Sequence, residues 1–95
     1  AIAKIKQAKA DICFLGTNAI DAESGITDND WEVVQLKKAM IASCKKVVCL
    51  AISEKVNTVQ PIQICGLSEI DILITELDAG NPLLKPYADA GIQIL

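Results

Sequence analysis

The chain is 95 residues long, 52% hydrophobic and carries a net charge of −3 at pH 7. All nine of its basic residues are lysines and it has no histidine. This composition excludes imidazole chemistry and the dense basic patch that binds nucleic acids. So short a chain buries roughly 60–65% of its unfolded surface. We therefore expect its many apolar residues to pack partly against further polypeptide, and interpret the chain as a fragment of a longer protein.

The four cysteines show no C-x-x-C spacing, and most lie in apolar runs: Cys13, Cys44, Cys49 and Cys65. This pattern favours buried free thiols in a reducing compartment, with disulfides or metal binding as the alternatives. No apolar run approaches the ~18 residues of a membrane span, and no signal-peptide pattern opens the chain. The cytoplasm is the expected location.

The first expected elements are a helix and a strand. Ile2, Ile5 and Ala8 recur at helical spacing and predict the last turns of a helix. Residues 12–15 form a continuous apolar run, which is typical of a strand that is covered on both faces. Gly16 ends this strand.

A second helix is expected after a polar loop. Asn29 is the predicted N-cap, Glu32 completes a capping box, and Asp28 and Asp30 add negative charge near the helix start. Lys45 and Lys46 suit the carboxyl end of the helix dipole.

A helical wheel predicts one apolar stripe on this helix, formed by Val33, Leu36, Met40 and Cys44. Lys37 falls at the border of the stripe. It either extends its stem along the apolar surface to reach water, or points along the sheet toward a ligand.

The rest of the chain repeats the pattern of strand and helix. Strands are expected at 47–52, 70–75 and 92–95, and a helix at 83–90 with Gly91 as its C′ residue. Residues 62–66 fit no single element. The order β-α-β-(irregular)-β-α-β predicts an α/β fold with a mostly parallel sheet.

Polar residues follow three of the expected strands, and parallel strands would bring them to one edge of the sheet. Hydroxyls, an amide, carboxylates and an ammonium group suit a polyhydroxylated ligand that bears an anion. These residues are Thr17, Asn18, Asp21, Ser53, Lys55, Thr75 and Glu76. The alternative is that they are ordinary polar residues of a strand-end edge.

Each single residue also has a purely structural interpretation. Asp21 could form a solvated turn, Thr27 could brace the helix start, and Glu32 could serve capping alone. Asp71 could stabilise a turn, and Trp31 is interpreted as a packing residue. The chain has no glycine-rich phosphate motif and no Ser/His or Cys/His pairing. The residues alone therefore indicate part of a parallel α/β domain with a polar edge.

Three segments closely resemble the carboxyl-terminal sensor domain of DeoR-family bacterial transcription regulators. They are FLGTNAIDAESGITDNDWEVVQLKKAM, the strand end LAISEK, and LSEIDILITE. The family pattern reads F-L-G-x-x-G-I-D-x-x-x-G-x-T-T, then D-x-S-K, then P-L-S-E-I-D-x-L-I-T-D. The resemblance runs from about residue 10 to residue 95.

The chain departs from this pattern at four positions. Ala19 replaces a glycine, Asp28 the second threonine, Ile52 an aspartate, and Gly66 stands where proline is common. Loss of the aspartate removes one polar contact, so we expect an effector that differs from the family's commoner ones.

The resemblance implies a Rossmann-like, mostly parallel sheet with flanking helices, related to ribose-5-phosphate isomerase. Residues 1–95 would then be the carboxyl-terminal part of the effector-sensing domain. The amino-terminal winged helix-turn-helix and the phosphate-loop half of the sensor would lie outside this chain.

The implied function is to bind a phosphorylated sugar and to oligomerise, as part of a DNA-binding repressor of sugar metabolism. Operator DNA would bind through the other domain, and neither membrane, metal, cofactor nor catalysis is expected. The alternatives are a sugar-phosphate isomerase-like enzyme, with Asp21 or Glu32 as base and Lys55 stabilising charge, or an oligomerising domain with a vestigial pocket. The predicted ligand residues are Asn18, Asp21, Thr27, Glu32, Lys37, Ser53 and Lys55.

Overall fold

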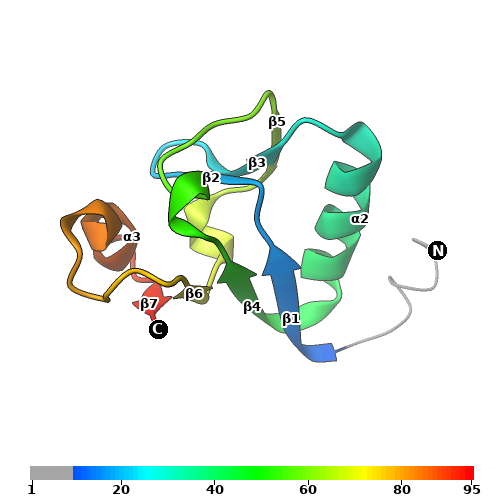
Figure 1. The fold of residues 1–95 in the computed structure, drawn as a ribbon. Helices are drawn as coiled ribbons and strands as arrows, with labels where there is room; N and C mark the ends of the chain where they lie inside the picture. Colours follow the sequence, from blue (N-terminus) through cyan, green and yellow to red (C-terminus); the bar gives the residue numbers. More distant parts are fainter. Residues whose placement is uncertain (1–9) are drawn as a thin grey trace.

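The computed structural model describes residues 10–95 (Figure 1). The helix expected from Ile2, Ile5 and Ala8 lies outside the described residues. In chain order, the strands and helices are β1 (Ala10–Gly16), β2 (Ala19–Asp21), β3 (Gly25–Asp28), α2 (Trp31–Ala42), β4 (Cys44–Leu50), β5 (Ile62–Cys65), β6 (Ile72–Ile74), α3 (Lys85–Asp89) and β7 (Gln93–Ile94). Short 3₁₀ helices span Ser53–Lys55, Leu67–Glu69 and Pro82–Leu84.

The larger sheet is parallel and has the strand order β1-β4-β6-β7. Phe14 of β1 pairs with Val48 of β4, which in turn pairs with Ile72 of β6. The four strands lie where continuous apolar runs predict them, and Gly16 ends β1 as expected. The α/β class and the mostly parallel sheet are therefore confirmed.

A second sheet, which the sequence did not predict, is antiparallel and has the order β2-β3-β5. The unassigned segment 62–66 supplies β5. Gly25 begins β3 at φ 69, and a Cβ there would lie 2.1 Å from the backbone oxygen of Cys65. Only glycine fits this position, because it combines a positive φ with the close approach of β5.

The start and end of α2 differ from the prediction. Asp30, not Asn29, is the N-cap, and its Oδ1 accepts from the backbone N–H groups of Glu32 (2.9 Å) and Val33 (3.3 Å). The predicted capping box is therefore wrong. The Asn29 N–H donates to Asp28 Oδ1, and the N-cap lies one residue later than predicted. The helix ends at Ala42, which leaves the Lys45-Lys46 pair in β4 and no basic residue in the last turn.

The predicted apolar stripe of α2 is only partly correct: Met40 packs against the core residues of β1 and β4, but the most buried residues of the helix are others. Val34 and Ala39 are its buried residues, whereas Leu36 is 37% exposed and Cys44 lies in β4. The antiparallel sheet sets this face, since Val34 packs in one core with β3 and β5. Trp31 is 61% exposed, so its interpretation as a packing residue is wrong.

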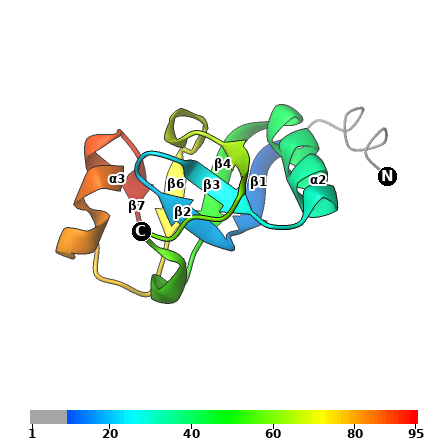
Figure 2. The same cartoon turned by 90° about the horizontal axis from the view of Figure 1, so that it is seen from above.

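The core lies on one side of the parallel sheet, which we call the inner face. Its residues in β4 and β6, Cys49 and Leu73, pack with Ile20 of β2, Val34 of α2 and Tyr87 of α3. Both helices and the second sheet therefore cover the same face, as the two views indicate (Figure 2).

The opposite side, which we call the outer face, is open in the described residues. Ile12 is 48% exposed and Phe14 is 58% exposed, so the expectation that β1 is covered on both faces is wrong. The cause is topological. A run of strands added in one direction by right-handed crossovers sends every connection over the same face.

The carboxyl-terminal part is fixed by α3 and the turn after it. Gly91 takes φ 93, and its N–H donates to the Ala88 oxygen, which confirms the expected glycine end of this helix. Asp71 does not form the expected turn. Its Oδ2 accepts from the Val47 N–H at 2.8 Å and so ties β6 to β4. No helix within residues 10–95 has the length and apolar character to cross a membrane.

Tyr87 connects three segments and is fully buried. Its hydroxyl oxygen lies 2.6 Å from Asn57 Oδ1 and 3.2 Å from the Ile20 backbone oxygen, and it accepts from the Asn57 N–H at 3.3 Å. Asn57 has φ 61, which this hydrogen-bonded corner stabilises. Burial raises the pKa of the Tyr87 phenol, so it stays a neutral donor.

We expect Tyr87→Phe to lower the free energy of unfolding by about 1–2 kcal/mol, because it leaves buried hydrogen-bonding groups without their partner. Urea denaturation followed by circular dichroism measures this change. Trp31→Phe, on an exposed aromatic residue, is the matched control and should have little effect. Equal stabilities for the two variants would contradict this role of the hydroxyl.

Candidate functional site

The carboxyl ends of β1, β4 and β6 meet at one edge of the parallel sheet. The Thr17 N–H donates to the Leu50 oxygen at 2.9 Å, and the Ala51 N–H donates to the Ile74 oxygen at 3.0 Å. The loops that follow these strands therefore start side by side. This arrangement brings the hydroxyls of Thr17, Ser53 and Thr75 to the same edge, as the strand pattern predicts.

Glu76 holds the 3₁₀ helix Ser53–Lys55 against the end of β6. One carboxylate oxygen accepts from the Ser53 N–H at 2.8 Å, and the other accepts from the Ser53 hydroxyl at 2.6 Å. The Thr75 hydroxyl adds a third hydrogen bond at 3.1 Å. The Ser53 hydroxyl bond is the main cause that lowers the pKa of Glu76.

Lys37 reaches the same edge from α2. Its ammonium group donates to the Gly16 backbone oxygen at the end of β1, and lies 3.9 Å from Asp28 Oδ2. The side chains of Lys37 and Asp28 are only 18% and 7% exposed. The interpretation in which Lys37 extends its stem to reach water is therefore wrong, because its ammonium group lies at the end of β1.

Asp28 is the partner that the sequence did not assign to Lys37. Its Oδ1 also accepts from the N–H groups of Asn29 (2.7 Å) and Asp30 (3.2 Å), so it joins the end of β3 to the start of α2. The sequence feature that could have indicated this role is that Asp28 stands where the family pattern has threonine. Here the carboxylate neutralises an ammonium group that would otherwise face the edge uncompensated.

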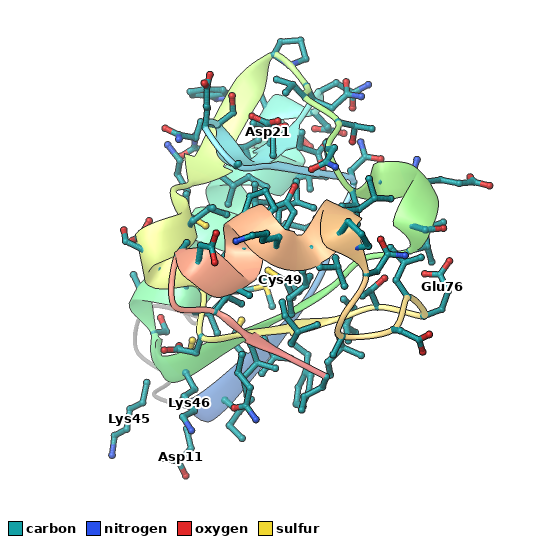
Figure 3. The ribbon with its side chains drawn as sticks, turned by 90° about the vertical axis from the view of Figure 1, so that its left-hand side faces the viewer. Asp11, Asp21, Lys45, Lys46, Cys49 and Glu76 are labelled. Atoms are coloured by element: carbon teal, nitrogen blue, oxygen red, sulfur yellow. The ribbon has the colours of Figure 1, made fainter. Side chains whose placement is uncertain are left out.

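Asp21 and Thr27 have structural contacts in the smaller sheet. Asp21 Oδ2 accepts from the Glu23 and Ser24 N–H groups, both at 3.1 Å, and so forms the β2–β3 turn. Thr27 is 2% exposed, and its hydroxyl accepts from the Gln60 N–H at 2.8 Å. Figure 3 shows Asp21 well apart from Glu76. The structure therefore does not bring Asp21 to the Ser53 end of the edge.

The remaining predicted residues are more accessible. Asn18 is half-buried in the loop after β1, and Lys55 is half-buried at the end of the 3₁₀ helix. Among residues 10–95, the Lys55 ammonium group has no ion-pair partner. Glu32 is exposed in the first turn of α2.

A shallow hollow of about 230 Å³ lies at the carboxyl ends of β4 and β6. Its lining is mostly apolar and consists of Leu50, Ala51, Ile52, Ile74, Thr75 and Glu76. Ile52 occupies the position of the aspartate in the family pattern, and it is 55% exposed. The hollow therefore combines an apolar wall with two polar groups at its rim.

The cysteines offer no reactive thiolate at this edge. Burial raises the pKa of Cys49 to about 12 and those of Cys13 and Cys65 to about 11. The expectation of buried free thiols is confirmed for three of the four, and these thiols are protonated at neutral pH. Within the described part of the chain, no acidic and cysteine side chains gather into a metal-binding group.

We expect Lys37→Met to lower the free energy of unfolding by about 1–3 kcal/mol, because it leaves the Asp28 carboxylate buried without its counter-charge. Adding Asp28→Asn should recover part of the loss, and a double-mutant cycle by urea denaturation measures this coupling. Lys38→Met, at the exposed neighbouring position, is the control. Additive losses in the cycle would contradict the coupling between Lys37 and Asp28.

The hydrogen bonds between the Glu76 carboxylate and Ser53 should weaken in acid. The folded-state pKa of Glu76 is lowered, so its contribution is present above the unfolded pKa and is lost as the pH falls through the folded value. The stability difference between the wild type and Glu76→Gln should therefore be constant at neutral pH and vanish in acid. Side-chain carboxyl NMR titration should also show a higher Glu76 pKa in Ser53→Ala. An unchanged pKa would rule out the hydroxyl as the cause.

Comparison with known proteins assigns this architecture to a family. Residues 1–77 match the family model described as "DeoR C terminal sensor domain". The chain is 38% identical over 87 residues to the HTH-type transcriptional regulator GlpR of Haloferax volcanii, covering 90% of this chain and 33% of the relative. It is 29% identical to the HTH-type transcriptional regulator GolR of Listeria innocua serovar 6a, with coverages of 95% and 35%.

A third relative is the glycerol-3-phosphate regulon repressor of Haemophilus influenzae, 32% identical over 71 residues, with coverages of 75% and 28%. The chain thus spans about a third of the length of these relatives. All three are transcriptional regulators, not enzymes. The chain belongs to the DeoR family of transcriptional regulators, within its C-terminal sensor domain.

Proposed function

We propose that this chain is the carboxyl-terminal part of an effector-sensing domain in a cytoplasmic, DNA-binding repressor of sugar metabolism. The domain has a Rossmann-like sheet of the ribose-5-phosphate isomerase type. It binds a phosphorylated sugar at the carboxyl edge of the parallel sheet. Operator DNA binds through the regulator's other domain, since this chain has a net charge of −3.

The observation that carries the proposal is the convergence at one edge of hydroxyl groups and of Lys55, which has no ion-pair partner among residues 10–95. Ser53 and Lys55 lie on the same 3₁₀ helix, which Glu76 fixes against β6. Hydroxyls and the Asn18 amide suit the hydroxyls of a sugar, and Lys55 suits an anion. Ligands of parallel α/β sheets bind beyond the carboxyl ends of the strands.

The two lysines at this edge, Lys37 and Lys55, have different roles in the proposed binding. Asp28 neutralises Lys37, so Lys55 is the cation that remains for an anionic group. One ammonium group is a weak phosphate site compared with a cradle of backbone N–H groups. The phosphate therefore takes its main contacts from the regulator's other half, while these residues face the sugar.

Sensing would work by population shift. An effector that binds one arrangement of the sensor oligomer more tightly raises the population of that arrangement. The DNA-binding heads then take a spacing that favours or disfavours the operator. The coupling is reciprocal, so operator DNA should change effector affinity by the same factor.

Two other functions receive less support. In an isomerase, Asp21 would act as a base, but its Oδ2 already accepts two backbone hydrogen bonds in the β2–β3 turn. Glu32 lies on an exposed helix start. An oligomerising domain with a vestigial pocket remains the alternative, because Ile52 replaces a polar family residue at the hollow.

A thermal-shift screen tests the proposal. The protein is a chimera in which this chain replaces the matching 87 residues of the Haloferax volcanii regulator. The panel contains sugar phosphates and glycerol 3-phosphate, with unphosphorylated sugars and inorganic phosphate as controls. A ligand at about 100 times its dissociation constant adds about 2.7 kcal/mol and should raise the midpoint by several degrees.

We expect a shift for one or two phosphorylated ligands. Lys55→Ala should reduce it, whereas Lys85→Ala, which removes an exposed lysine of α3, should leave it unchanged. A flat panel would favour the vestigial-pocket alternative. A shift that Lys55→Ala leaves unchanged would place binding elsewhere in the chimera.

A further inference from the structure

The hollow at the carboxyl ends of β4 and β6 differs in character from the rest of the polar edge. Its wall is apolar, and two of the side chains in it, Ile52 and Leu50, are 55% and 41% exposed. Apolar surface in contact with water favours a ligand that covers it with an apolar group. The volume of about 230 Å³ limits that group to one part of a small molecule.

The polar groups at the rim of the hollow are already hydrogen-bonded to one another. The Ser53 and Thr75 hydroxyls donate to the Glu76 carboxylate at 2.6 and 3.1 Å, and the Ser53 N–H donates to it at 2.8 Å. The oxygen of a ligand hydroxyl beside Ile52 therefore finds no free side-chain donor at this rim. Such a hydroxyl loses its hydration without a full replacement, which weakens binding.

Two departures from the family pattern change the charges of the edge together. Ile52 stands in place of an aspartate, so the hollow has one carboxylate fewer. Asp28 stands in place of a threonine, and its Oδ2 lies 3.9 Å from the Lys37 ammonium group. The chain thus has an acidic partner for this lysine and an apolar side chain in the hollow. An aspartate accepts hydrogen bonds from ligand hydroxyls, whereas isoleucine accepts none.

Ile52 and Lys55 are the first and last residues of one backbone turn. The Lys55 N–H donates to the Ile52 oxygen at 2.9 Å, which places the two Cα atoms within about 7 Å of each other. Glu76 holds this turn against β6 through Ser53. One sugar phosphate can therefore contact the cation and the apolar wall together.

We propose that Ile52 determines the specificity of this edge and that the effector is a phosphorylated deoxy sugar. The ligand turns a methyl or methylene carbon, which carries no hydroxyl, toward Ile52 in the hollow. The inference rests on the proposed function, because it requires a sugar phosphate at the carboxyl edge of the sheet. One apolar contact of this kind discriminates between ligands by about 10- to 100-fold in affinity.

Pairs of ligands that differ by one hydroxyl test this proposal in the Haloferax chimera. The pairs are 2-deoxyribose 5-phosphate with ribose 5-phosphate, 2-deoxyglucose 6-phosphate with glucose 6-phosphate, and 6-deoxyglucose 1-phosphate with glucose 1-phosphate. Isothermal titration calorimetry measures the ratio of the two dissociation constants in each pair. In a pair that binds, the deoxy ligand should bind at least about tenfold more tightly than its hydroxylated partner.

Ile52→Asn should bring this ratio close to one, because an amide hydrogen-bonds to a hydroxyl and adds no charge beside Lys55. Val59→Asn, at a loop residue that is 56% exposed and does not line the hollow, is the matched control and should leave the ratio unchanged. Ile52→Val should retain the preference. A preference that survives Ile52→Asn overturns the proposal. If that variant also lowers the ligand-free midpoint, Ile52 is a packing residue.

If Ile52→Asn does not fold, carbon-13 labelling of the isoleucine methyl groups in the unsubstituted chimera gives the answer. The Ile52 NMR signal, assigned with Ile52→Val, should shift more with a deoxy ligand than with its hydroxylated partner. An Ile52 signal that a bound ligand leaves unmoved overturns the proposal.

The same panel separates the specificity role of Ile52 from the proposed function. Equal affinities within every pair that binds overturn the role of Ile52 and leave sugar-phosphate sensing intact. A panel in which no ligand binds overturns both.

Discussion

The parallel pairing of β1 with β4 is the constraint on which the rest of the structure depends. It aligns Gly16 with Leu50, so the loops after both strands leave the sheet at the same level. It also requires a crossover, and α2 supplies it over the inner face. The position of the polar edge and the one-sided core both follow from this pairing. Side-chain contacts such as Lys37 to Gly16 then fix the edge in detail.

Strands of the parallel sheet could be predicted from the sequence because each is a continuous apolar run that ends at polar residues or glycine. The β2–β3 hairpin could not, because its strands have three and four residues and their apolar pattern is too short to read. The prediction of the buried face of α2 failed for a related reason. A helical wheel ranks faces by composition, but the unpredicted sheet selects the face that contains Val34.

The sequence predicts the position of the candidate site at the strand ends, but not the contacts within it. Thr17 and Thr75 follow their strands directly and Ser53 lies shortly after the end of β4, so topology alone brings them to one edge. Their partners were not predictable, because Glu76 and Ser53 are 23 residues apart and the sequence contains no signal that joins them. The family resemblance supplied the identity of the domain. The turn that Asp21 forms was among the interpretations of the sequence, whereas the contacts of Asp28 emerged only from the structure.

The deeply buried thiols have a consequence for the type of signal that this domain transmits. Oxidants attack thiolates, and a thiol with a pKa of about 11 or 12 is almost wholly protonated in the cell. Cys13, Cys49 and Cys65 are therefore poor targets for peroxide or for disulfide exchange. This protection extends to three of the four cysteines, since Cys44 is only half-buried. The effector signal proposed for the sheet edge would then not depend on the oxidation of these three thiols.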